Sequence, residues 1–279
     1  MLSVKPEIPI EPNVLAVLEY VHSAAKAQGV QYLMIGARAI DIQLHNVHGL
    51  ATFNPTNDTD FAVAVESWTH FNALKNALIG TGKFIPDRHK AQRLEYEGAS
   101  PVDLVPFGAL ENPRGTISWP PDFDQTMAVQ GFAEINAAAE EIAVPGRAIV
   151  LRAASLPGLV MLKFLAWRDR RGTKDARNIA ALLQKYSLIM DDSRIFTDEA
   201  LYRSLGYDNV KVGAALLGKD AAGIATHATI SAVQEIIVNG IERGNLLSQV
   251  GSGLGSVDAD SQLSTAEELL KAFLAGFKK

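Results

Sequence analysis

Apolar residues recur along the chain at two spacings, one typical of strands and one of helices. Residues 30–35 form a short apolar run that predicts a buried strand, and in residues 59–65 apolar side chains occupy every second position. Residues 92–97 also alternate, and the turn residues 98–101 that follow predict a hairpin with a second, more apolar strand. Residues 14–27 repeat apolar positions at the helical period and end before a glycine, which predicts an amphipathic helix.

The same patterns assign most of the remaining chain. Further helices are expected from Ser67 to about Gly80, over residues 155–170 and 174–186, and through most of residues 191–279, with a flexible break at 251–256. Residues 148–152 are expected to form a strand, and residues 132–142 fit either a helix or a strand. Residues 108–126 are expected to be loop-rich. The order of these elements divides the chain into a part rich in strands and a helical C-terminal part.

Two aspartates one residue apart, Asp58 and Asp60, open the strand that is predicted up to Val65. Side chains two positions apart in a strand lie on the same face, so both carboxylates are expected to point the same way. Two anions held this close repel each other unless a cation lies between them, and hard oxygen ligands suit Mg²⁺ or Mn²⁺. The alternative is that both residues are turn or cap aspartates before a strand.

A third carboxylate, Asp103, lies in the apolar second strand of the predicted hairpin. A buried aspartate without a partner is costly, and a metal shared with Asp58 and Asp60 would satisfy it. The alternative is a structural aspartate that is held by hydrogen bonds.

A candidate anion site precedes these aspartates. Gly36 and Ala37 follow the strand at 30–35, and residues 38–44, beginning with Arg38, are expected to form a helix. A glycine at a strand-to-helix turn lets a phosphate approach the backbone, and the free N–H groups of the first helical turn favour negative charge. Many ordinary strand-to-helix turns also use glycine.

These motifs, in this order, resemble those of the DNA polymerase β-type nucleotidyltransferase superfamily. The pattern is an apolar residue with glycine, here in residues 35–39, then a DxD strand at 58–61 and a later strand with a third aspartate at 102–104. Within the superfamily the chain is similar to the AbiEii-like group, which includes toxins of type IV toxin–antitoxin systems. That group carries a helix with a lysine, an Ala-Trp and an Asp-Arg, followed by Lys-Asp, which matches residues 162–170 and then Lys174-Asp175.

The resemblance implies an α/β (α+β) fold, in which a mixed sheet with flanking helices is followed by a mainly helical region. It implies a nucleotidyltransferase-like catalytic domain over residues 1–152 and a helical C-terminal domain over residues 153–279. Asp58 and Asp60 would hold the Mg²⁺ or Mn²⁺ that carries a nucleoside triphosphate such as ATP or GTP. The same pair with Asp103 would hold a second ion near the acceptor hydroxyl.

The partners that the resemblance implies are a nucleoside triphosphate, an acceptor and an antitoxin. The acceptor hydroxyl would belong to RNA or tRNA, to a protein or to a small molecule. Three departures from the family pattern stand out: Ala37 replaces a serine that would contact phosphate, residues 45–56 form an apparent inserted loop, and Asn178 replaces the usual last aspartate of the Lys-Asp helix. The insertion either carries specificity or marks a degenerate site.

Cations on the predicted helix at 155–170 are candidates for binding the outer phosphates. Lys163, Trp167, Arg170 and Lys174 are spaced four, three and four residues apart, so they would share one face if the helix ran unbroken past Gly172. A cationic clamp on the β- and γ-phosphates suits nucleotidyl transfer. The alternative is that the stem of Lys163 lies along the edge of a core helix, with Trp167 packed beside it.

Composition limits the other classes of function. The net charge of −5 argues against a protein that binds nucleic acid over its whole surface, and the absence of cysteine excludes disulfides and thiol catalysis. The N-terminal residues lack the pattern of a signal peptide, and no long uncharged apolar run is present, so a soluble, cytoplasmic protein without a membrane segment is expected.

Three other functions stay open from the sequence. A DxD glycosyltransferase would also use a metal and a nucleotide-linked donor, although it would explain neither Gly36 nor Asp103. A non-catalytic module would bind nucleotide or phosphate without turnover. The helical C-terminal region would also suit a protein that acts only through partner interactions.

Overall fold

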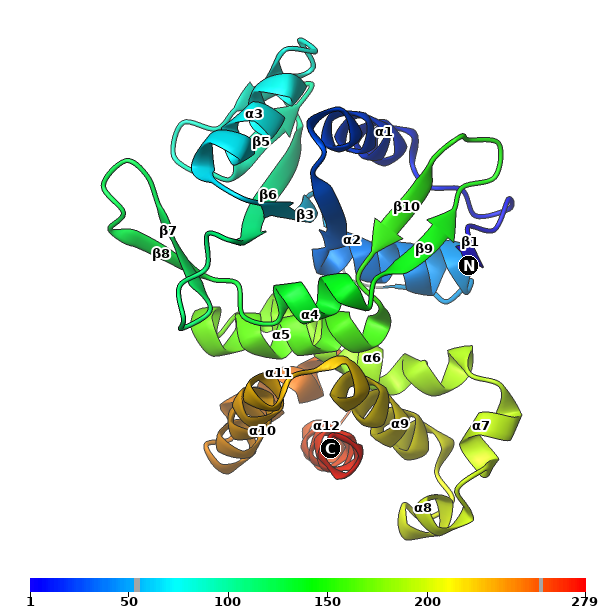
Figure 1. Cartoon of the computed structure of the whole chain (residues 1–279). Coiled ribbons are helices and arrows are strands. Elements are labelled where there is room, and N and C mark those ends of the chain that lie inside the picture. The colour runs from blue at the N-terminus through cyan, green and yellow to red at the C-terminus, as the bar shows by residue number, and fades with distance from the viewer. Residues whose placement is uncertain (53–55, 256–257) are drawn as a thin grey trace. The chain divides into compact units, whose positions relative to one another are not determined.

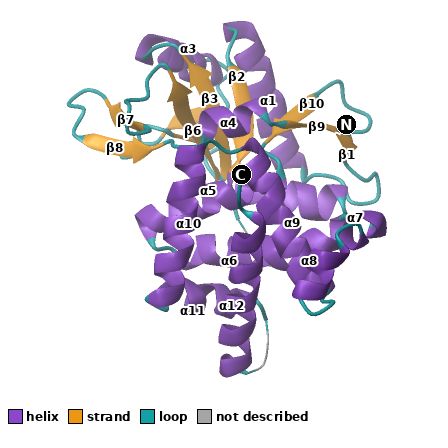
Figure 2. Cartoon of the chain, turned by 60° about the horizontal axis from the view of Figure 1, so that its bottom comes forward, coloured by secondary structure: helices purple, strands orange, loops and turns teal. Residues whose placement is uncertain are grey.

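The computed structural model describes residues 1–52, 56–255 and 258–279. The chain divides into two compact units, Met1–Ser155 and Leu156–Lys279, which we call the first and the second unit (Figure 1). Residues 53–55 of the predicted insertion and Ser256 of the predicted break lie outside the described residues. The expected α/β fold class is confirmed, because a mixed sheet in the first unit (strands orange in Figure 2) is followed by a helical second unit (purple).

The first unit contains all the described strands. Its strands are β1 (Leu2–Ser3), β2 (Gln31–Ile35), β3 (Thr59–Val65), β4 (Phe84–Pro86), β5 (Arg93–Tyr96), β6 (Ser100–Gly108), β7 (Thr116–Trp119), β8 (Gln125–Ala128), β9 (Glu140–Ala143) and β10 (Val150–Ala153). Its helices are α1 (Pro12–Gln28), α2 (Gly36–Asp41), a π-helical continuation (Ile42–Val47), α3 (Trp68–Ile79) and α4 (Phe132–Ala137).

Among the described residues, eight strands form one mixed sheet in the order β1-β9-β10-β2-β3-β6-β5-β4. At its centre β2 pairs antiparallel with β3, and β3 pairs parallel with β6. The predicted hairpin is confirmed as β5–β6, which is antiparallel. The arrangement places β2, β3 and β6 side by side, so the three segments that carry Gly36, Asp60 and Asp103 are neighbours.

The alternation in β3 separates a packed face from a face with polar groups. Phe61, Val63 and Val65 are buried, and the Phe61 ring meets Tyr32 of β2 at a centroid distance of 6.0 Å. Tyr32 in turn contacts His22 of α1, so this face of the sheet lies under α1, with α3 packed beside it. Asp60 is the residue next to Phe61 in the strand, so its side chain points to the opposite face of the sheet.

Local signals set the ends of the first helices. Helix α1 ends at Gly29, whose left-handed φ of 67° suits a glycine C-cap. Helix α3 begins after Ser67, whose hydroxyl accepts a hydrogen bond from the His70 N–H at 3.1 Å. Both ends agree with the predictions.

The prediction of a loop over residues 108–126 was wrong in part. A small antiparallel ribbon, β7–β8, forms there as a separate two-stranded sheet. Trp119 is its anchor, since its buried ring lies 5.0 Å from Trp68 and 5.7 Å from Phe71 on α3. The prolines and glycines that suggested a loop lie largely in the turns, and the apolar contacts of Trp119 stabilise the ribbon.

The second unit consists of helices in its described part. They are α5 (Leu156–Arg170), α6 (Thr173–Lys185), a short 3₁₀ turn (Tyr186–Ile189), α7 (Asp192–Phe196), α8 (Glu199–Ser204), α9 (Asn209–Ile224), α10 (His227–Glu242), α11 (Asn245–Gly253) and α12 (Ala259–Gly276). Its core contains Phe164, Trp167 and Phe273, all almost fully buried. None of the helices in the described parts of the chain has both the length and the hydropathy needed to cross a lipid bilayer.

One sequence expectation in the helical region needs correction. The break predicted at 251–256 begins later, because α11 continues to Gly253 and the left-handed Gly255, with φ of 71°, follows it. The helix at 155–170 does not run unbroken past Gly172, so Lys174 belongs to α6, whereas Lys163 and Arg170 both belong to α5. Arg171 and Gly172 redirect the chain between these two helices.

The predicted inserted loop at 45–56 also begins as ordered structure. The π-helix that continues α2 includes His45, Asn46 and Val47. The buried Asn46 amide donates to the carbonyl oxygens of Ile8 at 2.9 Å and Pro9 at 3.1 Å. These bonds hold the N-terminal segment against the first part of the insertion.

Helices α9 and α12 pack closely because glycines remove the side chains between them. A Cβ added at Gly218 of α9 would lie 2.2 Å from the carbonyl oxygen of Phe273 on α12. A Cβ at Gly276 of α12 would lie 1.8 Å from the carbonyl oxygen of Ala215 on α9. Both obstacles are backbone atoms, so the two helices would have to move apart to admit any side chain.

The substitution Gly218→Ala should therefore destabilise the protein, whereas Gly223→Ala on the same helix should not. We expect overpacking to lower the free energy of unfolding by about 1–3 kcal/mol at Gly218. At Gly223, where nothing lies within 4 Å of the added Cβ, the change should be neutral or stabilising by up to about 1 kcal/mol. Urea unfolding followed by the helical circular dichroism signal measures both, and equal effects would contradict the close α9–α12 packing.

Candidate functional site

The parallel pairing of β3 and β6 brings two of the predicted acidic residues together. Asp60 and Asp103 are register partners on these neighbouring strands, and Asp60 is also the register partner of Ile35, the last residue of β2. Asp58 lies just before β3, and its side chain is 44% exposed. Three predicted carboxylates thus lie at one end of the central strands, beside the turn from β2 into α2.

Gly36 is required by the position of the Asp60 carboxylate. It opens α2 directly after β2 with a left-handed φ of 77°. A Cβ at this position would lie 2.0 Å from Asp60 Oδ2 and 2.8 Å from Asp60 Cγ. The absence of a side chain therefore lets the carboxylate lie against the backbone of the turn, in addition to permitting the left-handed conformation. Ala37 and Arg38 follow in the first turn of α2.

Arg93 supplies the positive charge among these carboxylates. Its Nε donates to Asp103 Oδ1 at 2.7 Å and its Nη2 to Asp103 Oδ2 at 2.7 Å, a two-pronged pair. The same Nη2 lies 3.3 Å from Asp58 Oδ2. The side chains of Arg93 and Asp103 are only 16% and 14% exposed, so this pair is largely shielded from water.

The electrostatic effect on Arg93 follows from these contacts. The hydrogen bonds to Asp103 raise the pKa of the Arg93 guanidinium above its ordinary value, while desolvation opposes them; the charges of Asp103, Asp58 and Asp60 add to the increase. The guanidinium is therefore held charged, and it offsets part of the repulsion among the three carboxylates. In this arrangement Asp103 has the partner that a buried aspartate needs.

Sequence reasoning missed Arg93. It lies five residues before Gly98, and Asp103 lies five residues after it, so the two face each other across the hairpin as register partners. A symmetric placement about a turn is a usable signal once the turn is fixed. Arg93 otherwise looks like any polar residue of an alternating strand.

Arg38 faces the segment that precedes β3. Its Nη2 donates to the carbonyl oxygen of Thr56. Its Nε is buried and has no hydrogen-bond partner among the described residues. The Nε–H group of Arg38 is therefore a hydrogen-bond donor without an acceptor among the described residues.

Among the predicted phosphate-binding cations of the second unit, two meet at one carboxylate. Lys163 is buried, with its Nζ 3.4 Å from Asp175 Oδ1. Arg170 Nη2 donates to the same oxygen at 3.0 Å, although the Arg170 side chain is 65% exposed. Lys174 is exposed in the first turn of α6. Lys163 is therefore a buried, paired lysine, and Asp175 orients both cations.

The carboxylates of Asp58, Asp60 and Asp103 have the chemistry to bind a divalent metal. In the structure, however, Asp58 and Asp103 contact the Arg93 guanidinium. Carboxylate oxygens are the ligands that Mg²⁺ and Mn²⁺ prefer. In the part of the chain that the structure describes, no group of three acidic or histidine side chains is positioned to hold a metal ion. A cation that uses Asp58 and Asp103 together would have to replace the Arg93 guanidinium between them.

Comparison with known proteins gives only a weak likeness. No protein-family profile matches the chain, and no curated protein matches it. The chain is similar to the solution structure of the antibiotic-resistance factor ANT(2'')-Ia, with 16% identity and a TM-score of 0.36, over 76% of this chain and 96% of that one. A crystal structure of ANT(2'')-Ia in complex with adenylyl-2''-tobramycin gives 15% identity and a TM-score of 0.33, over 73% and 96%. Sequence identities and TM-scores this low do not support an inference about the reaction of this protein.

The close approach of Asp60 to Gly36 can be tested with matched glycine substitutions. Gly36→Ala should lower the free energy of unfolding by about 2–4 kcal/mol, since it combines left-handed strain with displacement of the carboxylate. Gly82→Ala, at φ of 71° with nothing within 4 Å of the added Cβ, should cost only about 1–2 kcal/mol. Urea unfolding followed by Trp68 and Trp119 fluorescence in a Trp167→Phe background compares them. Equal losses would show that Asp60 is not held against this turn.

Proposed function

We propose that this protein is a metal-dependent nucleotidyltransferase, which moves a nucleoside monophosphate from a nucleoside triphosphate to an acceptor hydroxyl. The observation that carries the proposal is the register of β3 and β6, which pairs Asp60 with Asp103 beside Gly36. Asp58 lies within reach of the same guanidinium as Asp103, so the two carboxylates converge on one cation-sized space. Polymerase-type phosphoryl transfer needs such a gathering of hard oxygen ligands next to a phosphate-binding turn.

In this proposal Asp58, Asp60 and Asp103 hold Mg²⁺ or Mn²⁺. A divalent cation bound there supplies charge stabilisation for the transferring phosphate and its pyrophosphate leaving group. The Gly36–Ala37 turn and Arg38 contact phosphate through backbone N–H groups and the unsatisfied Arg38 donor. Asp103 is also the residue that we propose to accept the proton of the acceptor hydroxyl.

Lys163, Arg170 and Lys174 are the proposed contacts to the outer phosphates. Asp175 holds Lys163 and Arg170 in fixed positions, which would lower the entropy lost when they bind an anion. It also neutralises part of their charge, so Lys174 would contribute the least compensated cation. The proposal includes ATP or GTP as donor, an RNA, protein or small-molecule acceptor, and a toxin role with an antitoxin partner, on the family resemblance of the sequence.

A second candidate function is a non-catalytic nucleotide- or phosphate-binding module. The observation that favours it is the two-pronged Arg93–Asp103 pair, which already neutralises the carboxylate that would hold the acceptor-side metal. Such a protein would bind a triphosphate without releasing pyrophosphate. Turnover separates the two functions.

The carboxylates should be essential for transfer but not for folding. With radiolabelled nucleoside triphosphates, Mn²⁺ or Mg²⁺, and total RNA or lysate as acceptor, Asp60→Asn and Asp103→Asn should each lower label transfer at least about a hundredfold, since removing one stabilising group from a transition state typically costs 10²–10³. Asp122→Asn, at an exposed position outside the site, is the control.

The two aspartate variants should differ in stability. Asp60→Asn relieves like-charge repulsion and should unfold like the unsubstituted protein or slightly later. Asp103→Asn should unfold earlier, because it leaves the shielded Arg93 with a weaker partner. Full transfer activity in folded Asp60→Asn protein at saturating nucleotide would overturn the assignment, and metal-dependent triphosphate binding without any pyrophosphate release would favour the binding module.

Arg93 should compete with a divalent cation for the carboxylates. Arg93→Gln removes a positive charge next to Asp58 and Asp103, so Mn²⁺ should bind at least several-fold more tightly. Arg88→Gln, at an exposed position outside these contacts, should leave the affinity unchanged. Free Mn²⁺ measured by electron paramagnetic resonance reports binding without any turnover. Weaker Mn²⁺ binding in Arg93→Gln would instead show that Arg93 organises the carboxylates for the metal.

A further inference from the structure

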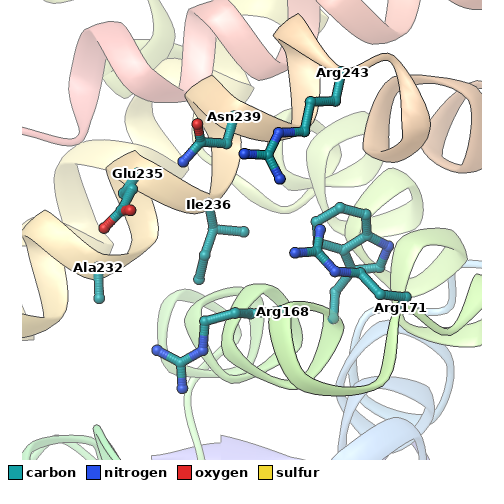
Figure 3. Close-up of a pocket in the computed structure, with 8 residues that line it drawn as sticks. Arg168, Arg171, Ala232, Glu235, Ile236, Asn239 and Arg243 are labelled. Atoms are coloured by element: carbon teal, nitrogen blue, oxygen red, sulfur yellow. The ribbon is translucent and has the colours of Figure 1, made fainter.

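A second polar site lies within the helical unit, and its charged residues are not among those proposed above to bind metal or nucleotide. A pocket of about 230 Å³ opens between α5 and α10. Three arginines line it, Arg168 and Arg171 at the end of α5 and Arg243 at the end of α10 (Figure 3). Their neighbours in the lining include Trp167, Asn239 and Glu235. The pocket thus combines three positive charges with one negative charge.

Two of the three guanidiniums form no ion pair with a carboxylate in the described part of the chain. Arg168 Nε donates to Asp169 Oδ1 at 2.8 Å. For Arg171 and Arg243, no ion pair is formed with any described acidic residue. Figure 3 shows Arg243 reaching from α10 toward the same space that Arg171 borders from the other side. Two uncompensated cations that border one pocket repel each other, and an anion between them would remove that repulsion.

Arg171 is held in place on both its backbone and its side chain. Its φ of 52° is left-handed, which costs a residue with a side chain about 1–2 kcal/mol. Its guanidinium carbon lies 4.4 Å from the centroid of the Trp167 ring. The buried Trp167 donates its Nε1–H to Gln249 Oε1 at 2.7 Å, and Gln249 Nε2 donates back to the Arg171 carbonyl oxygen at 3.3 Å. The stack on Trp167 orients the guanidinium before any ligand arrives.

The simpler explanation for these arginines is the helix dipole. Cations near the last turns of α5 and α10 are favourable whether or not they bind anything. That effect accounts for their position in the sequence. It does not account for the strained backbone of Arg171, its fixed stack on Trp167, or the convergence of Arg171 and Arg243 on one concave site with a side-chain amide, Asn239.

We propose that this pocket binds a phosphate group, either of a free phosphate compound or of a nucleic-acid phosphodiester. Guanidinium forks match phosphate oxygens with paired hydrogen bonds, and the Asn239 amide can add another donor. Because Arg171 already covers the Trp167 ring, no nucleobase can stack there, so recognition would be of phosphate and not of a base. Glu235 would oppose binding and tune it. This proposal does not depend on the transferase function.

Trp167 gives the site its own spectroscopic reporter. The protein has three tryptophans, and Trp68 and Trp119 belong to the first unit. In a ¹⁵N-labelled full-length chain, a Trp167→Phe substitution identifies the indole N–H signal of Trp167 among the three. Titration with pyrophosphate, without divalent metal so that a metal-dependent site stays silent, should shift the Trp167 signal saturably. The Trp68 and Trp119 signals should stay in place and also report that the first unit is folded.

Matched variants test whether the arginines are responsible. Arg243→Ala should weaken pyrophosphate binding roughly tenfold or more, the effect of losing one charge-assisted contact. Arg243→Lys should recover part of that loss, since it keeps the charge without the fork. Arg177→Ala removes an exposed arginine of α6 outside the pocket and should change the affinity less than twofold. Glu235→Gln should strengthen binding.

The outcomes either support the proposal or overturn it. No movement of the Trp167 signal with pyrophosphate or with a short single-stranded RNA overturns it, as does equal weakening by Arg243→Ala and Arg177→Ala, which would reflect net charge alone. The two probes distinguish the sources of the phosphate. Tighter binding of the RNA with a steep salt dependence assigns the pocket to phosphodiesters, whereas tighter binding of pyrophosphate assigns it to free phosphate compounds.

Discussion

The repulsion among Asp58, Asp60 and Asp103 is the constraint around which the first unit is organised. The parallel register of β3 and β6 sets Asp60 beside Asp103, and like charges on neighbouring strands repel each other. The protein offsets this repulsion in two ways. The Arg93 guanidinium forms paired hydrogen bonds with Asp103 and approaches Asp58, and the bare backbone at Gly36 gives the Asp60 carboxylate room. A protein that needed only a stable sheet would place apolar residues there, because replacing buried ion pairs with packed hydrophobic groups is often neutral or stabilising.

The sequence predicted most of this framework because each element carried its own local signal. The alternation after Asp58 gave β3 and the face of Phe61, the apolar run gave β2, and the turn at Gly98 gave the β5–β6 hairpin. Arg93 was not predictable in the same way. Its pairing with Asp103 depends on the exact register across the β5–β6 hairpin, which the alternation of β5 alone does not specify. The β7–β8 ribbon was not predicted, because the local sequence is rich in turn residues. The tertiary contacts of Trp119 that stabilise the ribbon are not visible in the sequence.

The cations of the second unit show where helical spacing stops being informative. A lysine, a tryptophan, an arginine and a second lysine at intervals of three and four residues would share one face of an unbroken helix, but the left-handed Arg171 ends α5 and α6 takes a new direction. The spacing then has no meaning beyond Arg170. Helical periodicity could not predict the contacts that this break produces. Asp175 on α6 contacts Lys163 and Arg170, and the Arg171 guanidinium lies over the Trp167 ring. The left-handed conformation of Arg171 thus separates the cations that pair with Asp175 from Arg171 itself, which stacks on Trp167.

The difference between paired and unpaired cations separates two kinds of electrostatic site in this chain. Arg93 lies between carboxylates and is largely shielded from water, so the metal ion of the proposed function would have to compete with it for Asp58 and Asp103. Arg171 and Arg243 form no ion pair with a carboxylate of the described residues, so an anion would gain their charge without breaking such a pair, and the exposure of both side chains keeps that gain sensitive to salt. In the proposed transferase the first kind of site would be selective, because a cation that displaces Arg93 must recover the ion pairs that Arg93 gives up. The second is permissive, because any group with phosphate geometry satisfies it. A chain that handles polyphosphates would use the two kinds for different steps, the selective site where bonds are made and the permissive one where an anion is only held.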